Sequence, residues 1–224
     1  MLTDFQGLVD DLVRDGAGDI ATADRDEAIA RAVIRYSTDR PKIKIEDVVA
    51  AGGNYLDLPA AFDADFSQLV EIETPPDEAP PAILEPSAWS IYSTPAGDKI
   101  LFVNSLAAAA SVRLRYTIPH TLDGATDTVP DKDREAVCAW AAGLLLTQLA
   151  AKYSGDSQPT ITSDSVDHQS KGRDYAARAR ELRQRYLDHL GIDPKRTVPA
   201  GAVVDLDQDN SLGGDRLMHP RRRR

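Results

Sequence analysis

The segment 131–153 (DKDREAVCAWAAGLLLTQLAAKY) constrains the fold of this chain more than any other. It contains no proline, and alanine, leucine and glutamine are good helix formers. Its acidic residues stand near the start and Lys152 near the end, an arrangement that suits the dipole of a helix. At 1.5 Å per residue, about 22 residues would span roughly 33 Å, the width of a small domain. The segment therefore predicts one long helix.

Almost every residue between Val137 and Ala151 is apolar or small, whichever face of the helix it occupies. A helix that is apolar all round is normally enclosed by other elements. The sequence therefore predicts the central helix of a helical bundle or of a packed ring of subunits. A membrane span is the alternative, but the uncharged run 136–151 is shorter than the ~20 residues of a span, and it contains Gln148.

Charge and cysteine content restrict the class of protein. A chain of 224 residues can bury the core of one large domain or of two small ones. The formal net charge of −10 argues against a nucleic-acid binder held by general electrostatic attraction. Cys138 is the single cysteine, so an internal disulfide is excluded and a buried thiol is expected. The acidic start of the chain does not have the pattern of a secretion signal, and a soluble intracellular protein is expected.

Two short amphipathic helices are predicted at the start of the chain. Thr3 and Gln6 fit a capping box, and the apolar residues that follow fall on one helical face. A second helix is predicted from Asp24 up to Pro41, because proline closes a helix. Its apolar stripe comprises Ala28, Ile29, Ala32, Val33 and Tyr36.

Residues 42–124 show the alternation and the turn signals of β structure. The expected strands are, in chain order, 43–45, 55–58, 68–73, 89–92, 100–103 and 111–118. The first two are expected to pair across the turn at 52–54, and the fourth and fifth to form a hairpin. In the last strand, the alternate residues from Val112 to Ile118 face one way, whereas Arg113 and Arg115 face solvent. One small antiparallel sheet of five or six strands, inserted between helices, is predicted.

A last helix is predicted at 170–190, ended by Gly191 with Pro194 just beyond it. Its arginine-rich face is expected to be solvated or to face another subunit. The fold class is therefore α+β. Residues 1–41 and 125–191 are expected to form a bundle domain of about four helices, with a long central helix at 131–153. Residues 42–124 are expected to form an inserted β domain.

The segment 192–224 continues no helical period. It mixes proline, glycine and aspartate with the apolar patch 202–204 and ends in HPRRRR. Over thirty residues without regular structure are unusual inside a compact domain. The segment therefore predicts an extended C-terminal arm that is disordered or becomes ordered on a partner.

Motif searches identify no catalytic, cofactor or metal site. The sequence contains no glycine-rich phosphate loop, and its four histidines do not have metal-ligand spacing. The acidic run Asp205-x-Asp207-x-Asp209 lacks the turn glycine and the closing acid of a calcium loop. We therefore expect a protein that is not an enzyme and that uses no cofactor.

The order of the expected elements and several local stretches are similar to a known family. The stretches are EAIARAVIRYSTDRP, the hairpin WSIY…GDKILF, the strand RLRYTIPH, and REAVCAWAAGLLLTQLAAKYSGDS. Together they resemble the head–tail connector (adaptor) proteins of tailed bacteriophages over about residues 3–191. The C-terminal tail is not matched.

The resemblance implies a structural virion protein, located in the neck of the particle and, during assembly, in the host cytoplasm. It implies a homo-oligomeric ring, commonly of twelve copies, beneath the portal protein, with no membrane involved. The ring would extend the channel for double-stranded DNA without sequence-specific binding, and would provide the docking surface for the tail or the next neck protein. Subunit packing is expected on the long helix, at Ala139, Trp140, Ala142, Gly143 and Leu146.

The family's C-terminal segment often grips the portal. In this chain that role would fall to the arm. The candidate portal-binding residues are Val203, Val204, Leu206, Leu212, Leu217, Arg221, Arg222, Arg223 and Arg224.

Two other functions are alternatives. A small regulatory DNA-binding protein would use the arginine-rich last helix and the basic C-terminus, and would bind duplex DNA in a salt-sensitive way. A hydrolase with a site assembled from separated acids would need a concave pocket with strongly perturbed titratable groups.

Overall fold

The computed structural model describes residues 1–14, 18–95, 97–155 and 171–193, which form four α-helices and six strands. The helices are α1 (Leu2–Val13), α2 (Thr22–Asp39), α3 (Asp131–Lys152) and α4 (Lys171–Leu190). The strands are β1 (Lys42–Val49), β2 (Gly53–Asp57), β3 (Leu69–Glu73), β4 (Trp89–Thr94), β5 (Gly97–Leu106) and β6 (Ser111–Ile118). Short 3₁₀ turns lie at Pro86–Ala88 and Tyr153–Gly155. The mixed α+β class is confirmed.

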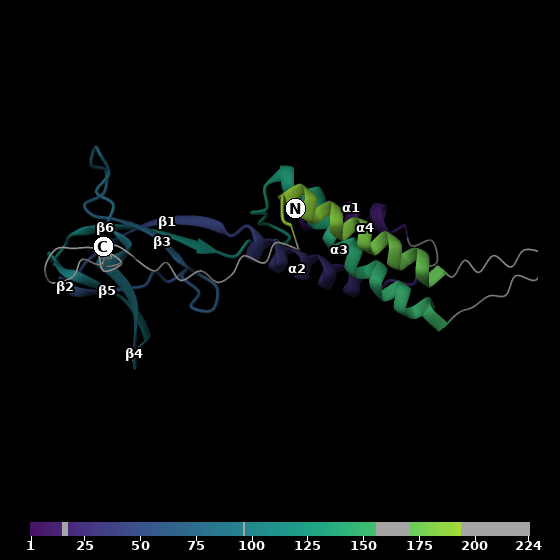
Figure 1. Cartoon of the computed structure of the whole chain (residues 1–224), viewed down its shortest axis with the longest axis horizontal. Coiled ribbons are helices and arrows are strands. Elements are labelled where there is room, and N and C mark those ends of the chain that lie inside the picture. The colour runs from purple at the N-terminus through teal and green to yellow at the C-terminus, as the bar shows by residue number, and fades with distance from the viewer. Residues whose placement is uncertain (15–17, 96, 156–170, 194–224) are drawn as a thin grey trace, which may run out of the picture.

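The helices gather at one end of the molecule and the strands at the other (Figure 1). We call α1–α4 the helical part and residues 42–118 the β part. α3 contacts each of the other three helices. The apolar core of the helical part includes residues from all four helices, among them Phe5, Ile29, Leu145 and Tyr186, each at most 1% exposed. Cys138 is fully buried in this core, as the sequence predicts.

The helix ends differ from the prediction by a few residues. α1 begins at Leu2, and its N-cap is Met1 rather than the predicted Thr3. Asp4 therefore takes the capping-box position that was predicted for Gln6. The Gln6 side chain instead donates a hydrogen bond to Asp26. α4 ends as predicted. The amide of Gly191 donates to the carbonyl of Asp188 and that of Ile192 to Leu187, which is a Schellman motif. Gly191 has a φ of 70°, a left-handed conformation that glycine adopts without strain.

The strands form two antiparallel three-stranded sheets rather than the single predicted sheet. One has the order β1-β6-β3 and the other β2-β5-β4. The predicted pairing of 43–45 with 55–58 is therefore wrong. β1 instead pairs along its whole length with β6, from Lys42 opposite Ile118 to Val49 opposite Ser111. The glycine turn redirects the chain, since Gly52 and Gly53 have φ values of 96° and 92°. The β4–β5 hairpin is confirmed.

The β part has an apolar core of its own. Its buried members are the inward residues of β6, residues of β2, β3 and β5, and the residue that follows β1: Ala50, Leu56, Ile72, Ile100, Phe102, Val112, Leu114 and Tyr116. This confirms the predicted inward face of β6 for Val112, Leu114 and Tyr116. On the outer face, Arg113 pairs with Asp47 and Asp77, each at 2.7 Å. The two cores share no residue.

Candidate functional site

The junction between the two parts contains a buried carboxylate. Two connections cross it, one from α2 to β1 and one from β6 to α3. Asp133, in the first turn of α3, is 1% exposed. The Tyr36 hydroxyl of α2 donates to its carboxylate at 2.7 Å, and His189 Nε2 of α4 lies 2.8 Å from it. Arg40 Nη1 approaches to 3.3 Å. One side chain thus joins α2, α3 and α4.

The electrostatics identify Asp133 as an ionised anchor. Burial raises the pKa of Asp133, but hydrogen bonds from Tyr36 and His189 and the charge of Arg40 outweigh it, so that the pKa lies below its ordinary value. Burial and the bond to Asp133 both raise the pKa of Tyr36. A general base works best with a pKa near the operating pH. The arrangement therefore favours a structural role over proton transfer.

A second buried tyrosine repeats the arrangement at the end of α2. The Tyr186 hydroxyl of α4 donates to Asp39 at 2.7 Å, and Arg35 pairs with the same carboxylate at 2.8 Å. Burial, followed by the bond to Asp39, raises the pKa of Tyr186. The ends of α2 and α4 that face the β part are therefore fixed to each other by a hydrogen bond that is largely shielded from water.

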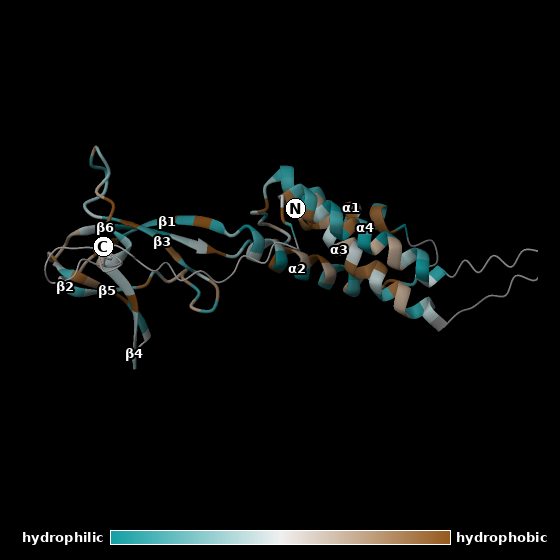
Figure 2. Ribbon diagram, in the orientation of Figure 1, coloured by the Kyte–Doolittle hydropathy of each residue, from teal (hydrophilic) through white to brown (hydrophobic). Residues whose placement is uncertain are grey.

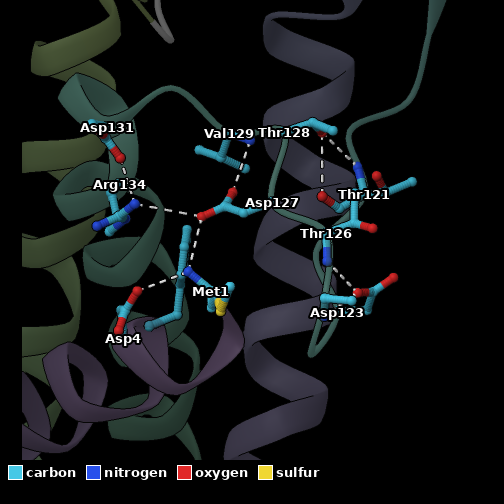
Figure 3. Close-up of polar contacts among 12 residues, drawn as sticks. Met1, Asp4, Thr121, Asp123, Thr126, Asp127, Thr128, Val129, Asp131 and Arg134 are labelled. Atoms are coloured by element: carbon cyan, nitrogen blue, oxygen red, sulfur yellow. Dashed lines mark hydrogen bonds and ion pairs between the residues drawn. The ribbon is translucent and has the colours of Figure 1, made fainter.

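The connection 119–130, from β6 to α3, is held by its own polar side chains (Figure 3). Asp123 accepts from the amides of Ala125 and Thr126 at 2.7 and 2.6 Å. The Thr128 hydroxyl accepts from the Thr121 amide at 2.9 Å. Asp127 accepts from the Val129 amide at 3.0 Å and pairs weakly, at 3.5 Å, with Arg134 of α3. These contacts fix the shape of the connection.

His120 joins the two connections. Its backbone amide donates to the Ser37 hydroxyl of α2 at 2.9 Å. Its ring nitrogens lie 2.9 Å from the carbonyl oxygen of Thr128 and 3.0 Å from that of Arg40. Its ring also packs on Tyr36, with centroids 4.9 Å apart. Because Tyr36 in turn binds Asp133, the packing of the helices and the position of both connections are coupled.

The junction was not predicted as a site. In the sequence, Asp133 is one of the acids that favour the start of a helix, and His120 and His189 are among the histidines without metal-ligand spacing. The residues that meet are far apart in sequence: the residue numbers of Tyr36 and Asp133 differ by 97, and those of Asp133 and His189 by 56. The weak local signal was the spacing of four residues between Tyr36 in α2 and Arg40, the C-cap of that helix, and this spacing alone indicates no partner.

The predicted subunit-packing residues are packed within the chain itself. Ala139, Ala142 and Leu146 are fully buried, and Gly143 lies against the α4 backbone at Ala179. The ring centroid of Trp140 lies 5.5 Å from the guanidinium carbon of Arg35 and 5.8 Å from that of Arg183, and 4.9 Å from the ring centroid of Tyr186. Their packing against a second subunit stays a prediction.

The predicted portal-binding residues lie outside the described residues. They are Val203, Val204, Leu206, Leu212, Leu217, Arg221, Arg222, Arg223 and Arg224. The acidic run 205–209 lies outside them as well. The described chain ends at Asp193, three residues after α4, and so beside the junction, where His189 contacts Asp133.

The β part exposes large apolar side chains that the sequence patterns did not single out. Among the described residues, the large apolar side chains that are exposed outside the β part are Met1 and Ile34. Those within it are Ile43, Ile45, Val49, Tyr55, Val70, Ile83, Ile91, Tyr92 and Val103. We call these nine residues the apolar β surface. Figure 2 shows part of it as brown segments along β1, between hydrophilic ones.

The outward isoleucines of β1 have a specific cause. Lys44 and Glu46 occupy the partly buried positions and pair at 2.9 Å, and Glu46 accepts from the Tyr116 hydroxyl at 2.8 Å. Successive residues of a strand face opposite sides. Ile43 and Ile45 therefore point outward and are 40% and 60% exposed. The β part thus carries apolar surface that its own core does not cover.

Neither a metal centre nor a membrane span is found in the described part of the chain. No group of three or more His, Cys, Asp or Glu side chains there could hold a metal ion. No helix there is long and apolar enough to cross a bilayer. No protein-family model matches the sequence, and no curated protein matches it either. Inferences about function therefore rest on the residues of the chain itself.

Proposed function

We propose that the chain is a structural head-to-tail adaptor of a phage neck, which forms a ring under the portal and presents a docking surface to the tail. The apolar β surface carries this proposal. Among the described residues, nine of the exposed large apolar side chains lie on the β part and two lie elsewhere, and apolar surface that a chain's own core does not cover can be buried against other proteins. The similarity of the element order to head–tail connectors indicates which kind of assembly those contacts would build.

In this proposal the four helices are a bundle, with α3 as its central helix. The chain's own helices cover Ala139, Ala142 and Leu146, so the bundle needs no neighbour to bury α3. The subunit contacts are then made chiefly by the β part and by the outer faces of the helices. A ring requires two different faces on each copy, and an elongated molecule with unlike ends offers them.

The charge of the chain suits a passive channel. With 36 acidic and 26 basic residues, each copy carries a formal net charge of −10. A ring of such copies would repel DNA phosphates along its wall and let the genome slide through. This fits a conduit for DNA with no turnover and no sequence-specific binding.

The arginines of α4 give little support to the DNA-binding alternative. Arg178 donates to the carbonyl of Leu12, Arg183 donates to the Thr147 hydroxyl, and Arg185 pairs with Glu135. To bind DNA phosphates, these guanidinium groups would first have to break their contacts within the chain. A duplex titration of the purified protein at rising salt tests the alternative, and tight salt-sensitive binding would contradict the adaptor proposal.

Removing the C-terminal arm tests the proposed attachment. We expect purified full-length protein to form rings in electron micrographs and to cosediment with portal rings of the same phage. A chain ending at residue 191 should keep its circular dichroism spectrum and still form rings, but should lose cosedimentation. Replacing Arg221, Arg222, Arg223 and Arg224 with Gln in the full-length chain separates the charge of the arm from its length.

Each outcome of this experiment has a clear reading. Unchanged cosedimentation of the shortened chain would remove the arm from the mechanism. Full-length protein that forms single particles, with no ring at any concentration and no portal binding, would overturn the adaptor proposal as a whole.

A further inference from the structure

An open cleft of about 560 Å³ lies at the junction, where α2 ends and where β1 and α3 begin. Its charged lining residues are Asp39, Arg40, Lys42, Lys132 and Asp133. The two aspartates are already paired within the chain, and their side chains are only 11% and 2% exposed. The charges left to face a ligand are therefore the three cations. We call this the junction cleft.

The three cations of the junction cleft are accessible. The Arg40 side chain is 45% exposed, and its contact with Asp133 is long, at 3.3 Å. Lys42 and Lys132 are exposed, and neither forms an ion pair with another described residue. The chain as a whole carries a net charge of −10, so these accessible charges are opposite in sign to those of the chain around them. The junction cleft therefore favours an anionic occupant.

The end of the described chain lies beside the junction cleft. Tyr186 and His189, in the last two turns of α4, contact Asp39 and Asp133 of the cleft wall at 2.7 and 2.8 Å. The described chain ends at Asp193, a few residues further on. The C-terminal arm therefore starts next to the cleft.

The arm contains one dense group of acids. Asp205, Asp207 and Asp209 belong to the run 203–210 (VVDLDQDN), which has no basic residue. In an extended chain alternate residues face the same side, so the three carboxylates can face one surface together. About twelve residues lead from Asp193 to this run, and they can span up to about 40 Å. The run can therefore reach the junction cleft.

Charge and position favour this run over other occupants. The arginines at 221–224 have the same sign as the accessible charges of the cleft. The chain also leaves the described part after Gly155, but that point follows the opposite end of α3, about 33 Å along the helix. A segment tethered beside its site acts at an effective concentration in the millimolar range, which favours the arm of the same chain over that of another copy.

We infer that residues 205–209 dock in the junction cleft of the same chain, with their carboxylates on Arg40, Lys42 and Lys132. A single exposed ion pair contributes little, but three pairs on a tethered segment act together. Docking holds the middle of the arm at the junction and leaves its arginine end free. The inference concerns the chain alone and does not require the adaptor function.

A disulfide between the arm and the cleft tests the docking. Ile43 lines the cleft and is 40% exposed, and Ser211 follows the acidic run. In dilute full-length protein with Ile43→Cys and Ser211→Cys, oxidised glutathione should close an intrachain disulfide at least about tenfold faster than in Ile34→Cys with Ser211→Cys. Ile34 is the matched control, since it is an exposed isoleucine of α2 outside the cleft lining. The native Cys138 is fully buried and should not react.

Removing the acids of the run tests what holds the arm. In the chain with the Ile43 and Ser211 cysteines, Asp205→Asn, Asp207→Asn and Asp209→Asn together should slow closure to the rate of the Ile34 control. Asp215→Asn removes an acid of the arm outside the run and should leave the rate unchanged. About 1 M salt should slow closure as the triple substitution does, because it screens exposed charges.

Reversing the charges on both sides tests the pairing itself. Lys42→Glu with Lys132→Glu should slow closure to the control rate. Changing the three aspartates of the run to Lys in that same chain should restore it. Circular dichroism checks that each variant is folded. If a variant is not folded, the salt titration decides, because it needs no charge substitution.

Each remaining outcome overturns the inference. Equal closure rates for the Ile43 and Ile34 chains, or closure that salt and the triple substitution leave unchanged, would exclude docking. Disulfides that form only between chains would assign the cleft to a second copy. Closure that inorganic phosphate slows, where chloride of equal ionic strength does not, would assign it to a phosphate ligand.

These outcomes are distinct from those of the adaptor proposal. Loss of docking leaves ring formation and cosedimentation with the portal untouched as tests of that function. Full-length protein that forms no ring and binds no portal overturns the adaptor function, and the closure rates of its single chains still decide the docking.

Discussion

Asp133 is the residue at which three helices meet. It accepts from Tyr36 of α2 and His189 of α4, and Arg40 lies within ion-pair distance. A buried charge is costly unless it is paired and hydrogen-bonded, so each of these donors is needed. Because Tyr36 also packs on His120, a change at Asp133 would reach both connections to the β part.

Replacing Asp133 with Asn should lower the free energy of unfolding at pH 7 by about 2–4 kcal/mol, because Tyr36 and Arg40 lose a charged acceptor in a buried place. The pKa of Asp133 lies below its ordinary value in the folded chain. The ionised Asp133 carboxylate therefore contributes its full stabilisation of the folded chain at a pH above the ordinary aspartate pKa of about 4. This contribution is lost as the pH falls through the pKa that Asp133 has in the folded chain. The two proteins should converge in stability in acid. Urea unfolding at pH 7 and at about pH 2 measures both effects.

Asp131→Asn is the matched control for this prediction. Asp131 lies two residues earlier in the same helix turn, with its side chain 87% exposed and paired with Arg134. Exposed pairs contribute little, so the change in the free energy of unfolding should stay below about 1 kcal/mol. Equal effects of the two substitutions would contradict the role assigned to the buried network.

At the scale of elements, α3 and α4 pack closely because small residues lie between them. A Cβ atom added at Gly143 would lie 3.1 Å from Arg183 Cγ and 3.2 Å from the carbonyl oxygen of Ala179. A helix backbone cannot move aside as an exposed side chain can. The spacing of the two helices is thus set by the absence of a side chain at one position.

Gly143→Ala should therefore lower the free energy of unfolding by about 1–3 kcal/mol through overpacking, although alanine favours helices. Gly7→Ala is the matched control, since Gly7 lies inside α1 and a Cβ there would meet nothing within 4 Å. That substitution should stabilise the protein by roughly 0.5–1 kcal/mol. Thermal unfolding of both variants measures the difference between the two substitutions. If both stabilise the protein, α4 can move away from α3 far enough to accommodate the added methyl group.

At the scale of the whole molecule, two separate apolar cores are joined by a polar junction. The chain has two tryptophans, and each part contains one: Trp89 packs against the β core and Trp140 against the helical core. The connections 40–41 and 119–130 are held together by His120. Each part can therefore report its own unfolding.

Single-tryptophan variants should show two distinct unfolding transitions. Trp89→Phe leaves Trp140 to report the helices, and Trp140→Phe leaves Trp89 to report the sheets. Since the cores share no residue, we expect different urea midpoints for the two fluorescence signals. Circular dichroism of each variant would show whether the substitution itself moved a midpoint. Coincident midpoints in both variants would mean that the junction couples the two parts into one cooperative unit.

Local patterns determined much of the secondary structure. The periods of α2 and α4, the apolar run of α3 and the alternation of β6 each place an element within a few residues of its observed bounds, because these signals depend on neighbours in sequence. The β4–β5 hairpin was predictable for the same reason, since its two strands are adjacent and a short turn joins them.

Strand partnership and the candidate site depended on the tertiary structure. β1 pairs with β6 over eight residue pairs, whereas β2 has only five residues. The residues around Ile43 do not indicate that a strand about seventy residues away is the longer partner. Likewise, Asp133 becomes a buried anchor only when Tyr36 and His189 reach it from two other helices. β4 is an edge strand of the described sheet only because the strand order leaves it outermost. A sequence records propensities along the chain, whereas burial, partnership and an exposed edge are properties of how distant segments pack.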